Sequence, residues 1–454
     1  MADTHYDLIV IGGGSGLRVM SHAAHEYGWK VALIEEGPLG GTCLNRGCIP
    51  SKILIHTADI VEEIKNAARF GIDAKIERID FSAIMARANS FVDEEARKIK
   101  EGLRDNKNID FYNTRAEFTG NKTLTVGGKT ITGERILIAA GTRPTAPPIP
   151  GLSGVRYLTS TEALRLTTQP KSMILIGGGY IATELGHFYG ALGTEITIVE
   201  MGGLLVPRED KDIAEIFTKL FSKKHTVLLG HKVLEVSEEG EVKKVLVEDA
   251  AGAKKELRAE ALLVAVGRRS NADILKIENT GVKVNKGGYI EVNEFMETNV
   301  PGIWALGDIV GKAPFKHGAN HEATYVAWNM KEGAKKRAVD YSVMPHAIFS
   351  SPQVAGVGFT EQEAQERGLS YEVRRHEYKR TGMGKALEET DGFVKYIVDP
   401  QEDIILGCHI LGPQASVLIH EVIVAMSAAG GRASAIRDAI HIHPALSELM
   451  ERPL

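Results

Sequence analysis

The chain of 454 residues contains little cysteine and only a small excess of charge of one sign. Three cysteines are too few for the disulfide framework of a secreted domain, which favours a reducing compartment. A net charge of −5 excludes a broadly basic surface for nucleic acid. No apolar run approaches the roughly 20 residues of a membrane-spanning helix, and a strand-like run at Tyr6 leaves no room for a signal peptide. We therefore expect a cytoplasmic protein that binds neither nucleic acid nor a membrane.

Glycine is abundant instead, with 48 residues, and several form a turn directly after an apolar run that ends at Ile11. This turn carries Gly12 and Gly14, and it is followed by a helix-like stretch and a second strand-like run. Glycines at these positions let the backbone approach a pyrophosphate, which lies on amides at the helix N-terminus. Glu35 ends the second run, where a carboxylate can accept hydrogen bonds from a ribose 2′-hydroxyl. The segment therefore predicts a first dinucleotide site.

The same pattern occurs again from Gly177 onward. Gly179 and the permitted Ala182 occupy the next two positions, and Glu200 ends the following strand-like run at the spacing seen in the first unit. Because chance seldom produces this spacing twice, we expect the chain to bind two dinucleotides. No arginine follows Glu200 before Arg208 to accept a 2′-phosphate, which favours NAD over NADP.

Two of the three cysteines, Cys43 and Cys48, lie close together after the first unit. A zinc site usually needs four ligands and closer cysteine spacings, and no second pair exists. A purely structural disulfide is unusual in a chain otherwise poor in cysteine. At the start of a helix the two sulfurs would lie about one turn apart near its positive end, which favours thiolates. We therefore interpret the pair as redox-active and expect no metal site.

Two dinucleotides and a dithiol require a group that exchanges electrons with both. Nicotinamide moves a hydride, whereas a disulfide is reduced by thiolate chemistry, and a flavin can take part in both reactions. We therefore expect FAD and NAD or NADH as the cofactors.

The chain resembles the flavoprotein disulfide oxidoreductases of the pyridine-nucleotide class over essentially its whole length. Besides both glycine motifs, five segments carry the resemblance. These are Gly40–Lys52, Ile138–Pro144, Val264–Asn271, Trp304–Asp308 and His441–Glu448. The sequence departs from the family pattern at Leu17, the third glycine position, and at Ala445, where threonine is common. The resemblance implies an α/β fold with two Rossmann-like dinucleotide-binding domains, for FAD and NAD, and a C-terminal α+β dimerisation domain.

The resemblance also implies how the chain is divided. We expect an FAD-binding domain over residues 1–148, an NAD-binding domain over 149–270, a central segment over 271–340 that completes the FAD site, and an interface domain over 341–454. The family uses the last domain to form a homodimer. One FAD is expected to be bound tightly in each subunit.

Four residues match positions that carry the dithiol and acid–base chemistry of the family. Cys43 is expected to meet the substrate, and Cys48 is expected to face the flavin. His443 is expected to exchange protons with a thiol, oriented by Glu448, because the ordinary pKa of imidazole lies near neutrality. Without the spacing of His443 to Pro444 and Glu448, a capping or core histidine would be the better interpretation.

Other residues match positions that contact the cofactors. Lys52 and Glu184 are expected to act as a catalytic pair near the flavin N5 and the nicotinamide, although Glu184 alone would fit a solvated acid near a helix N-terminus. Asp308 is expected to bind the ribityl chain. The complete set of expected cofactor contacts is Gly12, Gly14, Ser15, Gly16, Glu35, Thr42, Lys52, Ala116, Gly141, Asp308, His317, Gly177, Gly179, Ile181, Glu184, Glu200, Val233 and Gly267.

The choice within the family depends on a few segments. Ile49–Lys52 and Glu200 favour dihydrolipoamide dehydrogenase, which moves electrons between dihydrolipoamide and NAD. Lys316–Glu322, Leu387–Val394 and Leu411–Ser416 resemble mycothione reductases instead. We expect the first activity, and the alternatives are an NAD(P)H-dependent reductase of a low-molecular-weight disulfide, similar to mycothione reductase, or an enzyme similar to mercuric reductase.

Other functions fit less well. The C-terminus, Met450–Leu454, lacks the cysteine pair of mercuric reductase and the redox tail of large thioredoxin reductases. An NADH oxidase would use a single cysteine, and a redox-inactive binding protein would not need Cys43, Cys48 and His443. The expected substrate is a small-molecule or lipoyl-domain disulfide or dithiol, and a 2-oxoacid dehydrogenase complex is the corresponding multienzyme partner.

Overall fold

The computed structural model describes residues 4–331 and 333–454. The chain forms two compact units, and each is assembled from three separate stretches. Unit one contains the N-terminal stretch to Ile53 with Ala83–Thr145 and Gly267–Tyr341, and unit two contains Leu54–Ser82, Ala146–Val266 and Ser342–Leu454. The four domain ranges expected from the sequence stay a prediction.

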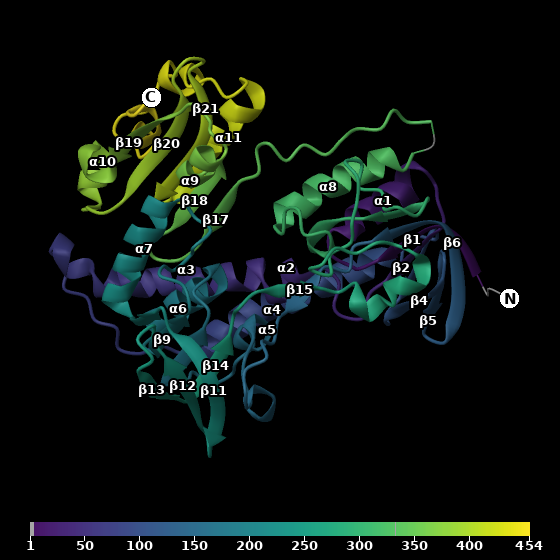
Figure 1. The fold of residues 1–454 in the computed structure, drawn as a ribbon, viewed down its shortest axis with the longest axis horizontal. Helices are drawn as coiled ribbons and strands as arrows, with labels where there is room; N and C mark the ends of the chain where they lie inside the picture. The colour runs from purple at the N-terminus through teal and green to yellow at the C-terminus, as the bar shows by residue number, and fades with distance from the viewer. Residues whose placement is uncertain (1–3, 332) are drawn as a thin grey trace. The chain divides into compact units, whose positions relative to one another are not determined.

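Unit one is built on a seven-stranded sheet with the order β3-β2-β1-β6-β5-β4, in which β16 also pairs with β6. Its first strand contains Leu8–Ile11, four apolar residues that are all buried, as expected for a parallel strand covered on both faces. Helix α1 (Gly16–Glu26) connects β1 to β2 and packs against α8 (Lys316–Asn329), as Figure 1 shows. The sheet strands are β1 (Thr4–Ile11), β2 (Val31–Ile34), β3 (Ile109–Tyr112), β4 (Ala116–Gly120), β5 (Thr123–Val126), β6 (Lys129–Ile138) and β16 (Ile303–Ala305).

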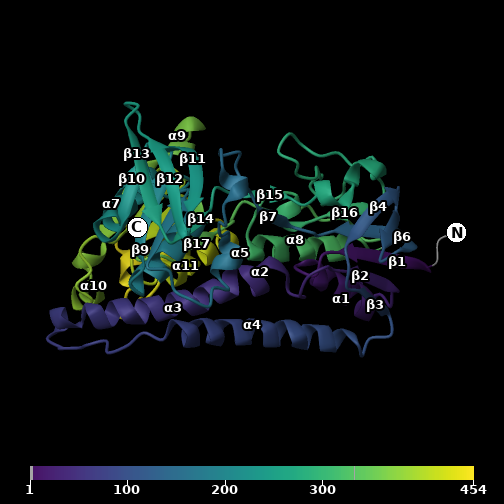
Figure 2. The same ribbon diagram turned by 90° about the horizontal axis from the view of Figure 1, so that it is seen from below.

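Further elements lie in unit one, and two of them are long helices that also include residues of unit two. Strands β7 (Thr142–Pro144) and β15 (Arg268–Ser270) form a separate antiparallel pair. Helix α2 (Gly41–Arg46) is followed at once by α3 (Cys48–Lys65). Helix α4 (Phe81–Leu103) is one uninterrupted helix of 23 residues (Figure 2).

Unit two contains a second nucleotide-binding topology. Four parallel strands have the order β10-β9-β8-β14, and α6 (Tyr180–Ala191) connects β8 to β9 as α1 connects β1 to β2. A three-stranded antiparallel ribbon, β11-β12-β13, follows in the chain (Figure 2). The elements are β8 (Ser172–Ile176), β9 (Glu195–Glu200), β10 (Thr226–Leu229), β11 (Lys232–Glu239), β12 (Val242–Glu248), β13 (Lys254–Ala259), β14 (Ala261–Val264), α5 (Ser160–Ala163) and α7 (Lys211–Lys224).

The C-terminal part of unit two is a five-stranded antiparallel sheet of order β17-β18-β21-β20-β19, with α11 packed against it. Two dinucleotide-binding topologies and this α+β part confirm the expected fold class. The elements are β17 (His346–Ile348), β18 (Val354–Gly358), β19 (Glu372–Glu377), β20 (Phe393–Asp399), β21 (Ile404–Leu411), α9 (Glu361–Glu366), α10 (Gly382–Ala386), α11 (Ala415–Ala428), α12 (Ser434–Arg437) and α13 (Glu448–Glu451).

Candidate active site

The first glycine turn lies between β1 and α1. Gly12 has φ of +110°, and a Cβ there would lie 2.3 Å from the carbonyl oxygen of Ala139, so only glycine fits. A Cβ on Gly16 would lie 2.9 Å from Val10 Cγ1. Gly16 therefore provides the close contact between helix and strand, which explains how Leu17 is accommodated at the third glycine position.

The second glycine turn repeats this geometry between β8 and α6. Gly177 has φ of +103°, and a Cβ there would lie 2.6 Å from the carbonyl oxygen of Ala265. Gly179 directly precedes the first residue of α6. Because each turn brings a strand end and a helix N-terminus together without side chains in between, both fit a dinucleotide pyrophosphate.

Each turn is also fixed by a glutamate at the end of the next strand. Glu35 accepts hydrogen bonds from the backbone N–H groups of Gly13 and Gly37, both at 2.8 Å. Glu200 accepts from Gly178 at 2.6 Å and from Gly202 at 2.7 Å. The two carboxylates thus hold equivalent positions beside their glycine turns, where a ribose would lie.

Asp308 lies in a short 3₁₀ helix, Gly307–Ile309, that follows β16. Its carboxylate accepts a hydrogen bond from the Thr142 hydroxyl at 3.0 Å, and Arg268 donates to the same hydroxyl at 2.8 Å. The segments around residues 142, 268 and 308, which are far apart in the sequence, therefore meet in unit one.

Cys43 lies in α2 and Cys48 is the first residue of α3. We expected the two cysteines to lie about one turn apart at the start of one helix, and this prediction was wrong. The helix breaks at Gly47, where a Cβ would lie 3.0 Å from the carbonyl oxygen of Thr42. Both cysteines are in the thiol form, with Cys43 half-buried and Cys48 exposed. A hydrogen bond between the two sulfurs and burial raise the pKa of Cys43, whereas the nearby Lys316 and Lys52 lower it.

Glu184 is buried on α6 and accepts a hydrogen bond from the backbone N–H of Phe349 at 2.9 Å. It is therefore not the solvated acid that its sequence position alone would fit. Lys52, the partner expected from the family, lies in unit one, and the pairing of the two residues stays a prediction.

The remaining expected cofactor contacts are distributed over both units. In unit one these residues lie in the first glycine turn, in or next to short elements, and in α8. They are Gly14, Ser15, Thr42, Ala116, Gly141, Gly267 and His317. In unit two they lie in α6 and β11; these are Ile181 and Val233. Their roles at a cofactor stay a prediction.

His443 and Glu448 lie next to each other at the start of the last helix. The Nδ1 of His443 is 2.9 Å from Glu448 Oε1, and Arg452 donates to the same oxygen at 3.0 Å. These two hydrogen bonds lower the pKa of Glu448 to about 2, so the carboxylate is charged. The His443 side chain is 73% exposed, which leaves its Nε2 available for proton exchange.

The neighbouring His441 behaves differently. Its side chain is only 6% exposed and its Nε2 lies 2.6 Å from Glu421 Oε1. Burial lowers the pKa of His441, but the hydrogen bond to Glu421 outweighs it and the pKa is raised. His441 is therefore a buried structural histidine, while His443 faces outward.

Sequence reasoning overlooked one basic group near the cysteine pair. Lys316, the first residue of α8, donates a hydrogen bond from Nζ to the Ser15 hydroxyl at 3.0 Å. The signal in the sequence is a lysine eight positions after Asp308, but only the fold shows that it lies beside the glycine turn.

Comparison with known proteins places this geometry in a family. Residues 6–330 match the domain described as pyridine nucleotide-disulphide oxidoreductase, and residues 344–453 match the dimerisation domain of the same family. The chain belongs to the pyridine nucleotide-disulphide oxidoreductases. It is therefore a flavoprotein oxidoreductase with a redox-active disulfide centre, and like other members it binds FAD and uses NAD(P)H.

Curated relatives of this oxidoreductase extend over nearly the full chain. Mycothione reductase from Mycobacterium tuberculosis is 37% identical, covering 99% of this chain and 98% of that protein. Dihydrolipoyl dehydrogenase from Geobacillus stearothermophilus is 36% identical, covering 98% of this chain and 94% of that protein. Near-equal identity to both supports disulfide oxidoreductase activity without selecting the substrate.

A solved structure has the same fold. The HOCl-induced flavoprotein disulfide reductase RclA from Escherichia coli is 31% identical, with a TM-score of 0.87 over 99% of each chain. The same protein has also been solved as a Cu(II) complex, with a TM-score of 0.88 over 99% of this chain and 98% of that chain.

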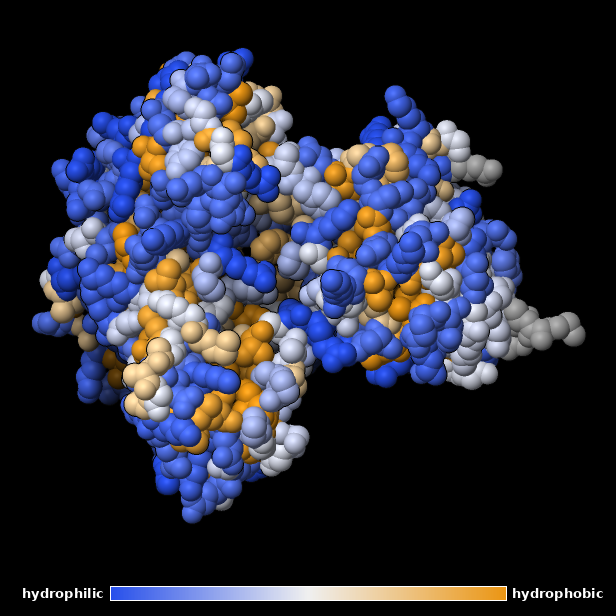
Figure 3. Space-filling view, viewed as in Figure 1, coloured by the Kyte–Doolittle hydropathy of each residue, from blue (hydrophilic) through white to orange (hydrophobic). Residues whose placement is uncertain are grey.

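The dimerisation domain of this oxidoreductase supports a homodimer. It exposes several large apolar side chains, which is unusual for a surface that stays in water. They are Val417, Val424, Ile440 and Ile442. The face drawn in Figure 3 is mostly hydrophilic, with apolar residues in scattered patches. Within the described residues, no helix is both long enough and apolar enough to cross a membrane.

Proposed function

We propose that this oxidoreductase is an NAD-dependent dihydrolipoamide dehydrogenase, which oxidises the dithiol of dihydrolipoamide to a disulfide and reduces NAD⁺ to NADH. The observation that carries the proposal is the position of Glu200. Two backbone N–H groups hold its carboxylate beside the second glycine turn. A ribose 2′-hydroxyl can donate to this carboxylate, whereas a 2′-phosphate would be repelled by it.

The cysteine pair supports the first half of the reaction. A thiolate of dihydrolipoamide attacks the sulfur of Cys43 in the Cys43–Cys48 disulfide, and the electron pair of the broken bond goes to Cys48. The second thiol of the substrate then attacks the first substrate sulfur in the mixed disulfide. This closes the substrate disulfide and releases Cys43. The first glycine turn and Asp308 would hold FAD, which would accept the two electrons released when the dithiol pair returns to a disulfide and would pass them to NAD⁺ as a hydride.

His443 supports the proton transfers in this scheme. Glu448 contacts the Nδ1 of the His443 imidazole and is itself held by a hydrogen bond from Arg452. The exposed Nε2 of His443 can then take a proton from the attacking thiol. Because Glu448 is ionised, it favours the proton on Nδ1 and so presents Nε2 as the base. Lys52, Glu184 and the expected cofactor contacts belong to the same proposal, as do a cytoplasmic location and a 2-oxoacid dehydrogenase complex as partner.

A second function has a specific observation in its favour. The identity to mycothione reductase is 37%, against 36% to dihydrolipoyl dehydrogenase. In that case the enzyme would run in the opposite direction and use NAD(P)H to reduce a low-molecular-weight disulfide.

Steady-state assays separate the two functions. We expect NAD⁺ reduction with dihydrolipoamide, little oxidation of NADH with mycothione or other small disulfides, and NADH preferred over NADPH about 5- to 150-fold in kcat/KM. Glu200→Arg should reverse much of this preference. The matched control is Glu195→Arg, because Glu195 is an exposed glutamate on the same strand and lies away from the turn. Efficient reduction of mycothione with no turnover of dihydrolipoamide would replace the first function by the second.

A further inference from the structure

A positive side chain that the proposed reaction does not use lies in unit one beside the first glycine turn. Lys316 is half-buried and its Nζ donates to the Ser15 hydroxyl at 3.0 Å. Ser15 is itself buried, and its hydroxyl donates to Asn320, one turn further along α8, at 3.1 Å. These contacts fix the ammonium group of Lys316 at one place between the turn and α8.

That place lies next to the helix that carries the first cysteine. Gly14 precedes Ser15 in the turn, and a Cβ on Gly41 would lie 2.7 Å from Gly14 Cα. The turn therefore touches the first residue of α2, two positions before Cys43. The backbone contact and the Lys316 hydrogen bond together bring the ammonium group into the surroundings of the cysteine pair.

The electrostatic interactions agree with this placement. Lys316 and Lys52 both lower the pKa of Cys43 against the effects of Cys48 and burial. Burial in turn lowers the pKa of Lys316, while the two cysteines and Asp308 raise it and Arg18 lowers it. These effects are those expected when the positive charge of Lys316 lies within electrostatic reach of the two sulfurs.

We propose that the ammonium group of Lys316 stabilises the thiolate that forms at the Cys43–Cys48 pair when its disulfide opens. When the disulfide accepts two electrons, one sulfur takes up a proton and the other remains a thiolate, whose charge is compensated by Lys316. Because attack on Cys43 leaves the electron pair of the broken bond on Cys48, the stabilised thiolate is that of Cys48. Lys52 from α3 adds to the positive field, and Asp308 opposes it.

This inference rests on the proposed dithiol chemistry at the cysteine pair, but it does not depend on which disulfide is the substrate. Lys316 acts on the thiolate through its charge, so replacement by arginine should preserve the effect and replacement by methionine should remove it. Lys316→Gln can keep a hydrogen bond to Ser15 without the charge, so the same shift in this variant separates the effect of the charge from a role in holding the turn.

The test measures the thiolate without any substrate. The FAD-loaded dimer is reduced, freed of reductant and treated with iodoacetamide over a range of pH, and alkylation of Cys43 and Cys48 is measured by mass spectrometry. In Lys316→Met we expect the midpoint of alkylation to move up by about one pH unit, which is about a tenfold smaller thiolate fraction at neutral pH. Lys316→Arg should keep the midpoint within a few tenths of a unit.

The matched control is Lys312→Met, an exposed lysine four residues before Lys316. It should leave the midpoint unchanged. If Lys316→Met binds FAD poorly, Lys316→Gln and the FAD-free forms of all variants are compared by the same alkylation profile. An unchanged midpoint in the neutral variants, or an equal shift in Lys316→Arg, would overturn the inference. Failure of the dihydrolipoamide assay with a clear alkylation shift would instead reject only the proposed function.

Discussion

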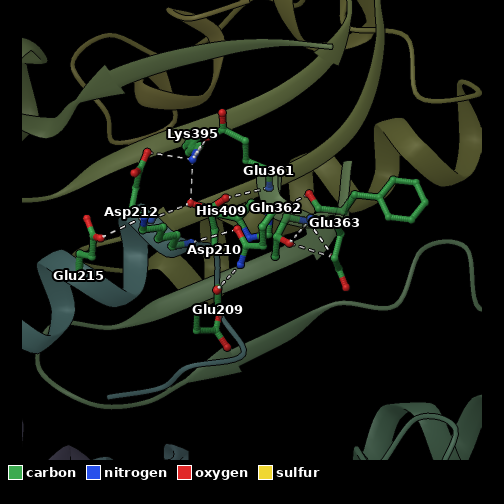
Figure 4. A network of polar contacts seen from close by, with 12 residues as sticks. Glu209, Asp210, Asp212, Glu215, Glu361, Gln362, Glu363, Lys395 and His409 are labelled. Carbon is green, nitrogen blue, oxygen red and sulfur yellow. Dashed lines mark hydrogen bonds and ion pairs between the residues drawn. The ribbon is translucent and has the colours of Figure 1, made fainter. Parts of the chain in front are cut away.

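Removing one buried lysine should strongly destabilise unit two. Lys395 lies in β20 with its side chain only 1% exposed, and its Nζ contacts three carboxylates (Figure 4). The distances are 2.8 Å to Asp210, 2.8 Å to Asp212 and 2.6 Å to Glu361. Asp210 and Asp212 come from the start of α7, while Glu361 begins α9. The lysine therefore connects three elements through its charge.

The size of the effect follows from how much water reaches each carboxylate after Lys395→Met. Asp212 and Glu361 are 40% and 37% exposed, so water can solvate them when the cation is lost. Asp210 is completely buried and would keep only backbone N–H groups as donors, from residues 212 and 361 at 3.1 and 3.0 Å. One uncompensated buried carboxylate costs about 3–5 kcal/mol, and the remaining hydrogen bonds favour the lower end, about 3 kcal/mol.

The effect should also depend on pH. Burial raises the pKa of Asp210, but hydrogen bonds from Lys395 and from the backbone outweigh it and the pKa lies below its ordinary value. In the native protein this carboxylate therefore stabilises the fold above the unfolded pKa of Asp, and the contribution is lost as pH falls through the lowered value. Without Lys395 the burial effect dominates, the pKa of Asp210 rises, and the variant regains stability as the acid becomes neutral. The difference between the two proteins should thus shrink as pH falls from 7 towards 4.

The free energy of unfolding can be measured with urea by circular dichroism, at fixed concentrations of protein and FAD. Lys395→Met with Asp210→Asn should recover most of the loss, because both charges are then absent while asparagine still caps α7. Lys255→Met, an exposed lysine on β13, is the control and should change stability by no more than about 0.5 kcal/mol. A loss below about 1 kcal/mol for Lys395→Met, or no recovery in the double variant, would refute the reasoning.

Two further predictions concern the proposed catalytic residues. Reduction of the FAD-loaded enzyme should produce a long-wavelength charge-transfer band in its absorbance spectrum. Cys48→Ser should abolish this band, whereas Cys43→Ser should show it without reductant. A band that survives Cys48→Ser would contradict the placement of Cys48 at the flavin. The family resemblance implies that each site of the dimer combines Cys43 and Cys48 of one subunit with the same site's histidine from the other subunit. Refolding Cys48→Ser together with His443→Ala should then restore about a quarter of native activity, because half of the randomly paired dimers are mixed and one of their two sites is intact. Activity that stays at the level of the parent variants, with mixed dimers confirmed by mass spectrometry, would show that each subunit builds its own site.

Parts of the protein could be predicted from the sequence because the interactions behind them are local. Gly12 and Glu35 belong to one strand–turn–helix–strand unit, and so do Gly177 and Glu200. The backbone of such a unit has few alternative conformations once its glycines and apolar runs are in place. Both dinucleotide-binding topologies follow from these patterns, and the complete fold class follows from the family resemblance. The close spacing of Cys43 and Cys48 is also a local feature.

Other features depend on backbone conformation and packing that the spacing of residues does not predict. The break at Gly47 places the two cysteines on separate helices, which the spacing alone did not predict. Gly16 replaces the missing third glycine through its contact with Val10. The composition of the two units, each from three separate stretches, likewise has no signature in a single segment of sequence.

By itself, the sequence determined the family, the two glycine turns with their glutamates and the presence of a redox-active cysteine pair. Only the tertiary structure decided which charged groups surround these features. Lys316 reaches Ser15 across 301 positions, and Lys395 reaches Asp210 across 185. A lysine in a sequence is most simply read as solvated surface, because burial of its charge is unfavourable without a partner. The partner is supplied by the packing of elements far apart in the chain, so the roles of these two lysines follow from the fold rather than from any local pattern.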